Sequence, residues 1–156
     1  ILLGRGPVFW IREPGYPLVG FVIAVLTFYS TRFRKLTASS ILIPDALALG
    51  AFTVMGAARA LEQGTAVFIA ALMGMITGVF GGVLRDVTCN EIPSIFVKDT
   101  HLYATCSFVG AWLYIGLERV GSPLWVATVA SILVTFTFRL AAVRYGWRLP
   151  EPGSLL

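Results

Sequence analysis

Five long apolar stretches, separated by short polar links, occupy most of the 156-residue chain. Each approaches the roughly 20 residues that an α-helix needs to cross the hydrocarbon core of a bilayer. Charged residues make up only 13% of the chain, about half their share in a soluble domain. The sequence therefore predicts an all-α fold, a polytopic membrane helix bundle whose main solvent is the lipid bilayer. The expected spans are about 16–31, 42–60, 65–86, 101–117 and 123–145.

Basic residues decide the expected orientation of the bundle, because cytoplasmic loops carry an excess of Lys and Arg. Short links make consecutive helices antiparallel, which divides the basic residues eight to four between the two sides of the membrane. We expect the side with eight, which includes the C-terminus, to be cytoplasmic, with Arg139 snorkelling toward it. The eight are Arg32, Arg34, Lys35, Arg85, Lys98, Arg139, Arg144 and Arg148.

Charge and motifs exclude several other functions. The net charge of +4 comes from basic clusters between apolar runs, which membrane topology explains without nucleic-acid binding. Cys89 and Cys106 are too few for a disulfide framework, and His101 is the single histidine, so we expect no metal site. The sequence contains neither a phosphate-binding loop nor a Ser/His/Asp constellation. We therefore expect no enzyme activity and no cofactor.

Two short segments match each other and suggest an internal repeat. PVFWIRE at 7–13 aligns with PSIFVKD at 93–99, at an offset of 86 residues, and an apolar stretch follows each copy. Three expected spans separate the copies, and because three is odd the copies lie on opposite faces of the membrane. Equivalent units in opposite orientation form an inverted repeat, an architecture of transport proteins whose permeant site lies near the midplane.

The repeat predicts how the single transmembrane domain over 1–156 is organised. Residues 1–36 end the first repeat, 41–117 form the second, and 122–145 add one extra helix. Two helices of the second repeat have counterparts that would precede Ile1. We therefore expect two further N-terminal helices in the intact protein. It would then have seven spans, three plus three plus one, of which five are visible in this sequence.

Glycines in the third stretch suit either close packing or an ion pathway. Gly74, Gly78 and Gly82 are spaced by four and share one helix face, and small residues at this spacing let membrane helices approach closely. The adjacent pair Gly81-Gly82 weakens a helix further, so we expect a kink or a break there. A broken helix frees carbonyl groups that suit a dehydrated cation. Thr77 adjoins Gly78 and joins the expected pathway.

Charged residues in two stretches have two interpretations each. Arg85 and Asp86 follow the glycine pair near the expected cytoplasmic interface, where they form either an interfacial ion pair or the gate at a pore mouth. Asp45 follows Pro44 and suits the first turn of a helix. A carboxylate inside an apolar stretch also suits a water-filled path. Thr53 lies on roughly the same face, which makes this helix a second candidate lining helix.

Three motifs make the chain resemble a known family. GVFGGVLRD ends the third stretch and contains Gly-Gly-x-x-Arg-Asp, and PDALALGAFTVMGA forms most of the second. ILLGRGPVFW, at the start, resembles the segment that follows an earlier copy of the glycine motif. On these motifs the chain resembles, from residue 1 to about 140, the prokaryotic TRIC (trimeric intracellular cation) channels, a family also described as bacterial glycine-transporter-like.

The resemblance implies a homotrimer with one pore in each subunit, in the inner membrane of a bacterial or archaeal cell. The pore would pass K⁺ and similar monovalent cations such as Na⁺. The resemblance also implies seven spans in an inverted repeat, a glycine kink at Gly81-Gly82 and trailing charges at Arg85 and Asp86. The family's first span and first glycine-kinked helix have no counterpart in this sequence.

A passive cation channel and a secondary transporter both fit these features, and the sequence favours the channel. A transporter for a small zwitterion such as glycine would need a helix N-terminus or an Arg for the carboxylate, and Arg85 is the candidate near the glycine pair. A membrane scaffold would leave the doubled glycine unexplained. The residues expected along the ion pathway are Gly78, Gly81, Gly82, Thr77, Asp45 and Thr53, and those at the gate are Arg85 and Asp86.

Overall fold

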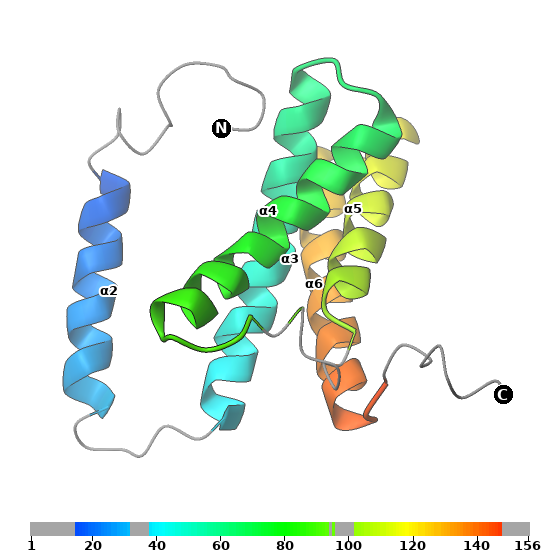
Figure 1. Cartoon of the computed structure of the whole chain (residues 1–156). Coiled ribbons are helices and arrows are strands. Elements are labelled where there is room, and N and C mark those ends of the chain that lie inside the picture. The colour runs from blue at the N-terminus through cyan, green and yellow to red at the C-terminus, as the bar shows by residue number, and fades with distance from the viewer. Residues whose placement is uncertain (1–14, 32–37, 94, 96–101, 148–156) are drawn as a thin grey trace, which may run out of the picture. The chain divides into compact units, whose positions relative to one another are not determined.

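The computed structural model describes residues 15–31, 38–93, 95 and 102–147, and within these ranges the regular structure is helical. Five α-helices follow one another along the chain (Figure 1). They are α2 (Gly15–Thr31), α3 (Ala38–Glu62), α4 (Val67–Thr88), α5 (Ala104–Arg119) and α6 (Leu124–Arg144). The all-α prediction is confirmed. Each helix occupies a stretch predicted for it, with ends that differ by a few residues.

The chain forms two structural units, Ile1–Ala38 and Ser39–Leu156. The first contains α2, a mostly apolar helix of 17 residues. The second contains helices α3–α6, in which α5 packs against both α4 and α6. Tight turns join α3 to α4 and α5 to α6. Gly64, between α3 and α4, and Gly121, between α5 and α6, have φ values of +71° and +81°, a left-handed conformation that favours glycine after a helix end.

Three of the described helices are long and apolar enough to cross a membrane: Ile41–Glu62 within α3, Val67–Thr88 and Leu124–Arg144. The other two, α2 and α5, have 17 and 16 residues. Of the two copies of the proposed repeat, only Pro93 and Ile95 lie among the described residues. The inverted repeat therefore stays a prediction.

The position of Pro44 differs from the sequence prediction. We expected the helix to begin near residue 42, with Pro44 in its first turn, but α3 begins at Ala38 and contains Pro44 in its interior. An interior proline removes one backbone hydrogen bond and its ring crowds the carbonyl four residues earlier. Membrane helices tolerate this because neighbouring side chains and local adjustment satisfy the freed groups. The prediction failed because it relied on the preference of proline for the first helical turn.

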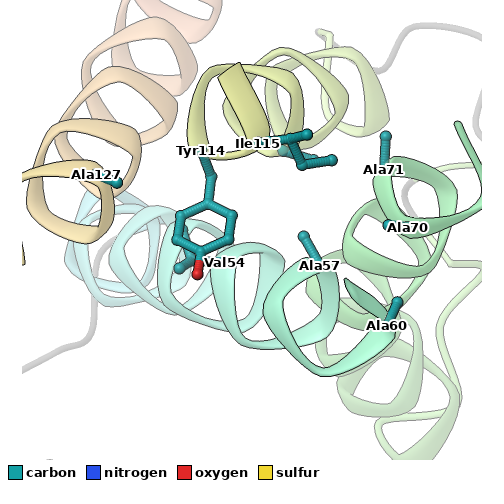
Figure 2. Packing of buried hydrophobic residues seen from close by; sticks show 9 residues of the cluster. Val54, Ala57, Ala60, Ala70, Ala71, Tyr114, Ile115 and Ala127 are labelled. Atoms are coloured by element: carbon teal, nitrogen blue, oxygen red, sulfur yellow. The ribbon is translucent and has the colours of Figure 1, made fainter. Parts of the chain in front are cut away.

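The core of the four-helix unit is built mostly from alanine. Figure 2 shows Tyr114 of α5 reaching toward α3 beside Val54, with alanine side chains on the neighbouring helices. The alanines of this cluster are Ala57, Ala60, Ala70, Ala71, Ala111 and Ala127. Side chains this short bring the helix backbones close together, as they do in packed membrane helices.

Glycines bring the helices closer still. A Cβ added at Gly74 of α4 would lie 2.8 Å from the carbonyl oxygen of Thr53, and one at Gly56 of α3 would lie 2.9 Å from that of Met73. A Cβ at Gly50 of α3 would lie 3.0 Å from the carbonyl oxygen of Ile132 on α6. In each case at least one obstacle is a backbone atom, which cannot move aside as a flexible side chain can; at Gly56 the side chain of Thr77 lies closer still. Helix α3 therefore contacts both α4 and α6 through positions where no side chain fits.

We expect Gly74→Ala to lower the free energy of unfolding by about 1–3 kcal/mol, because the added methyl group overpacks the α3–α4 contact. Helix propensity alone would have the opposite effect, a gain of up to about 1 kcal/mol. Gly116→Ala is the matched control, since a Cβ at Gly116 of α5 meets nothing within 4 Å. Thermal unfolding of the detergent-solubilised protein measures both. Equal stability for the two variants would contradict the packing described for Gly74.

Candidate functional site

Arg85, near the C-terminal end of α4, joins two carboxylates from two helices. Its Nη1 donates to Oδ1 of Asp45 on α3 at 2.6 Å, and its Nη2 and Nε donate to Oδ1 of Asp86 at 2.8 and 3.0 Å. The side chains of Asp45 and Asp86 are only 13% and 7% exposed, whereas that of Arg85 is 40% exposed. The guanidinium therefore neutralises two largely buried carboxylates and links α3 to α4 near the C-terminal end of α4.

Tyr103, directly before α5, is the second group that contacts Asp45. Its hydroxyl donates to Oδ1 of Asp45 at 3.4 Å, and the residue is only 5% exposed. Its ring end fits against Gly82 of α4, where an added Cβ would lie 2.7 Å from the Tyr103 hydroxyl oxygen. The absence of a side chain at Gly82 therefore leaves the space that lets α5 reach the α3–α4 ion pair.

Arg139 of α6 completes this group by packing on the other side of Tyr103. Its Cζ atom lies 4.6 Å from the centre of the Tyr103 ring, and its Nη1 donates to the carbonyl oxygen of Leu102 at 3.3 Å. The residue is 8% exposed, so the predicted snorkelling of Arg139 is wrong. We refer to Asp45, Arg85, Asp86, Tyr103 and Arg139 as the end cluster.

A second polar group lies deeper between α3, α4 and α5. Thr53 is fully buried, donates to the carbonyl oxygen of Leu49 at 2.6 Å and pairs with the hydroxyl of Ser107 at 2.5 Å. A Cβ at Gly78 would lie 2.9 Å from both the Leu49 carbonyl oxygen and the Ser107 hydroxyl oxygen. Hydroxyl and carbonyl oxygens of this kind can replace water around a monovalent cation, but here they satisfy one another.

The structure brings together most of the predicted site residues and separates two of them. Asp45, Arg85 and Asp86 share contacts in the end cluster, and Gly78 and Thr53 meet in the deeper polar group. Thr77 is exposed and donates to the Met73 carbonyl oxygen of its own helix at 2.7 Å, beside Gly56 of α3. A Cβ at Gly81 would meet nothing within 4 Å.

The expected break in α4 is absent. Helix α4 runs without interruption from Val67 to Thr88, through both members of the Gly81-Gly82 pair. The helical pattern therefore continues through the pair and leaves no interruption at which carbonyls would be freed, and the prediction of a broken helix was wrong. A gentler bend at this point stays a prediction. The two glycines differ in their surroundings, since Gly82 faces Tyr103 and Gly81 faces open space.

Sequence reasoning missed Tyr103, Ser107 and the buried position of Arg139. No local pattern distinguishes them, because each acquires its role from a helix distant in the sequence. Among the residues that the structure describes, no three His, Cys, Asp or Glu side chains lie together as a metal site requires. The two carboxylates of the end cluster, Asp45 and Asp86, are both bonded to Arg85.

Comparison with known proteins places the chain among bacterial membrane proteins. The profile of the glycine transporter family matches residues 42–119. The UPF0126 inner membrane protein YadS of Escherichia coli (strain K12) is 37% identical over 150 residues, which are 95% of this chain and 72% of the relative. A UPF0126 membrane protein of Vibrio cholerae is 34% identical over 149 residues, which are 95% of this chain and 62% of the relative.

Solved structures of the same fold are TRIC cation channels. The TRIC trimeric intracellular cation channel orthologue of Rhodobacter sphaeroides has a TM-score of 0.84 and 37% identity, over 93% of this chain and 74% of that chain. A TRIC cation channel solved to explain conductance has a TM-score of 0.82 and 33% identity, over 96% of this chain and 73% of that chain. These identities are high enough for the likeness to extend beyond the fold.

We expect Gly82→Ala to lower the free energy of unfolding by about 1 kcal/mol, because the new methyl group displaces the ring end of Tyr103. The cost should shrink in a Tyr103→Phe background, since the hydroxyl oxygen that the methyl group approaches most closely is then gone. Thermal unfolding of the two single variants and the double variant measures this coupling. Gly81→Ala, on the open face of the same helix, is the control and should not lower stability. Additive effects would show that Gly82 does not accommodate Tyr103.

Proposed function

This chain belongs to the TRIC channel family, which the glycine transporter profile also matches, and we propose that it conducts monovalent cations, K⁺ foremost, through a pore within each subunit of a homotrimer. The protein is a multi-pass membrane protein related to TRIC channels at 33–37% identity. The single observation that carries the proposal is the state of Arg85, whose three guanidinium nitrogens all donate to Asp45 and Asp86.

The bonds of Arg85 favour a channel over a glycine transporter. A transporter would need a cationic side chain or a half-helix N-terminus free to hold the substrate carboxylate. Arg85 already serves two carboxylates of the protein, and the unbroken α4 offers no half-helix N-terminus at the glycine pair. Both features expected of a zwitterion site near Gly81-Gly82 are thus missing from the described residues.

The ion pair between Asp45 and Arg85 acts as a gate in this proposal. It joins α3 to α4 at one end of the unit, and Tyr103 closes the same point from α5. When the pair separates, Asp45 becomes a free carboxylate that attracts cations to the pore mouth. Beyond it, the Thr53 and Ser107 hydroxyls between the same helices exchange their mutual hydrogen bond for contact with the permeant ion.

The roles of the remaining predicted residues follow from their positions. Asp45, Thr53, Gly78 and Gly82 line the proposed pathway. At its gate Arg85 pairs with Asp45 and is also bonded to Asp86. Thr77 and Gly81 lie on a different side of α4 from Gly78 and Gly82. The place of Gly81 along the pathway therefore rests on the family resemblance, and that of Thr77 rests on its position next to Gly78. The pathway needs no cofactor beyond the permeant K⁺ or Na⁺.

The proposed location is the bacterial or archaeal inner membrane, with the C-terminus in the cytoplasm. The relative from Escherichia coli is an inner membrane protein, and the excess of basic residues on the C-terminal side supports the orientation. The end cluster, near the C-terminal end of α4, then lies toward the cytoplasmic mouth of the pore.

Single-channel recording in planar bilayers with KCl on both sides tests the proposal on the full-length protein. We expect discrete cation-selective steps, and an open probability about fivefold or more higher in Asp45→Asn, because that variant loses a contact present only in the closed state. Glu62→Gln is the control, since Glu62 forms an exposed ion pair with Arg59 at 2.9 Å. Folded protein that passes no current while its vesicles accumulate radiolabelled glycine would contradict the channel.

A further inference from the structure

A buried arginine on α6 contacts the gate of the proposed channel without touching its ion pair. We infer that Arg139 is a positioning residue, which holds Tyr103 against Asp45 and thereby lets α6 set how firmly the Asp45–Arg85 pair stays closed. The inference rests on the proposed function and extends it, because it gives a regulatory role to the helix outside the predicted three-plus-three repeat.

Helix α6 contacts the segment directly before α5 at two residues, Leu102 and Tyr103. Arg139 lies over the Tyr103 ring at 4.6 Å and donates to the Leu102 carbonyl oxygen at 3.3 Å. The backbone N–H of Leu102 donates to the carbonyl oxygen of Trp147, just after α6, at 3.2 Å. Leu102 is therefore bonded through its carbonyl to α6 and through its N–H to the segment just after α6, so a shift of the C-terminal end of α6 should carry Tyr103 with it.

The hydrogen bond between Tyr103 and Asp45 is long. Its oxygen–oxygen distance of 3.4 Å exceeds the 2.5–3.0 Å usual for such a bond, and a bond this long weakens further with a small displacement. Gly82 limits the ring from the α4 side, while Arg139 limits it from the α6 side. The strength of the hydrogen bond between Tyr103 and Asp45 therefore depends on how closely Arg139 packs against the Tyr103 ring.

Position 139 carries a charge although it lies within a membrane helix. A charged side chain within a membrane helix is costly and usually serves function, and an apolar side chain of similar length would pack against Tyr103 at a lower cost. The guanidinium offsets the cost in part through the Tyr103 ring, since a buried cation over an aromatic face gains free energy, and in part through the Leu102 carbonyl. These same two contacts fix the orientation of Tyr103.

The test measures open probability in the full-length protein for Arg139→Met, Tyr103→Phe and the double variant. We expect each single variant to raise open probability about fivefold and the double variant to equal the larger single effect, because both act on one contact. Arg139→Lys should restore part of the effect by keeping a cation over the ring. Arg144→Gln, at the exposed end of α6, is the control and should leave open probability unchanged.

A second readout does not depend on conduction. Fluorine NMR of 3-fluorotyrosine at position 103, with a soluble paramagnetic reagent, reports how exposed the ring is. Arg139→Met should increase the paramagnetic broadening, and Arg144→Gln should not. Lower stability of Arg139→Met with unchanged broadening and open probability would overturn the inference. If Asp45→Asn raises open probability but Arg139→Met does not, the gate stands and the inference fails. If the protein never conducts, the proposed function fails and the broadening decides whether Arg139 positions Tyr103.

Discussion

Glycine and alanine positions let the helix backbones of this protein contact one another directly, and the polar contacts between the helices require that closeness. Lipid tails are as apolar as leucine, so membrane helices associate through packing and hydrogen bonds and not through the hydrophobic effect. Helix α3 packs closely against two neighbours. It contacts α4 at Gly56 and at the backbone opposite Gly74, and it contacts α6 at Gly50. Side chains at these positions would separate the helices and remove the packing that holds them.

Because the helices lie this close together, polar side chains on neighbouring helices can form hydrogen bonds with one another. Buried polar groups in a bilayer must be satisfied within the protein, and here the partners lie on neighbouring helices. Thr53 and Ser107 meet because Gly78 leaves room between them. Tyr103 reaches Asp45 because Gly82 leaves room for its ring. Glycine in α4 thus serves two purposes, helix packing and access of polar side chains to the α3–α4 contact.

Composition and glycine spacing were enough to predict the helices and their packing faces, but not the partners within the site. Five apolar stretches determined five helices, and the spacing of Gly74 and Gly78 predicted close approach. The start of α3 was wrong because Pro44 is tolerated inside the helix. The prediction of a break at Gly81-Gly82 was wrong because the low helix propensity of glycine does not by itself interrupt a helix that neighbouring helices support. The pairing of Asp45 with Arg85, 40 residues apart, and the burial of Arg139 depend on the tertiary fold, which no local pattern reports.

In the proposed channel the Asp45–Arg85 ion pair holds the cation pathway closed, and an exchange of the two charges is the sharpest test of that role. Open probability would be recorded for Asp45→Arg, for Arg85→Asp and for the two together in the full-length protein. If the pair is the gate, each single reversal should open the channel by placing like charges opposite each other, and the exchanged pair should close it again toward the wild-type level. An exchanged pair that stays as open as the single variants, or single variants that gate as the wild type does, would contradict that role.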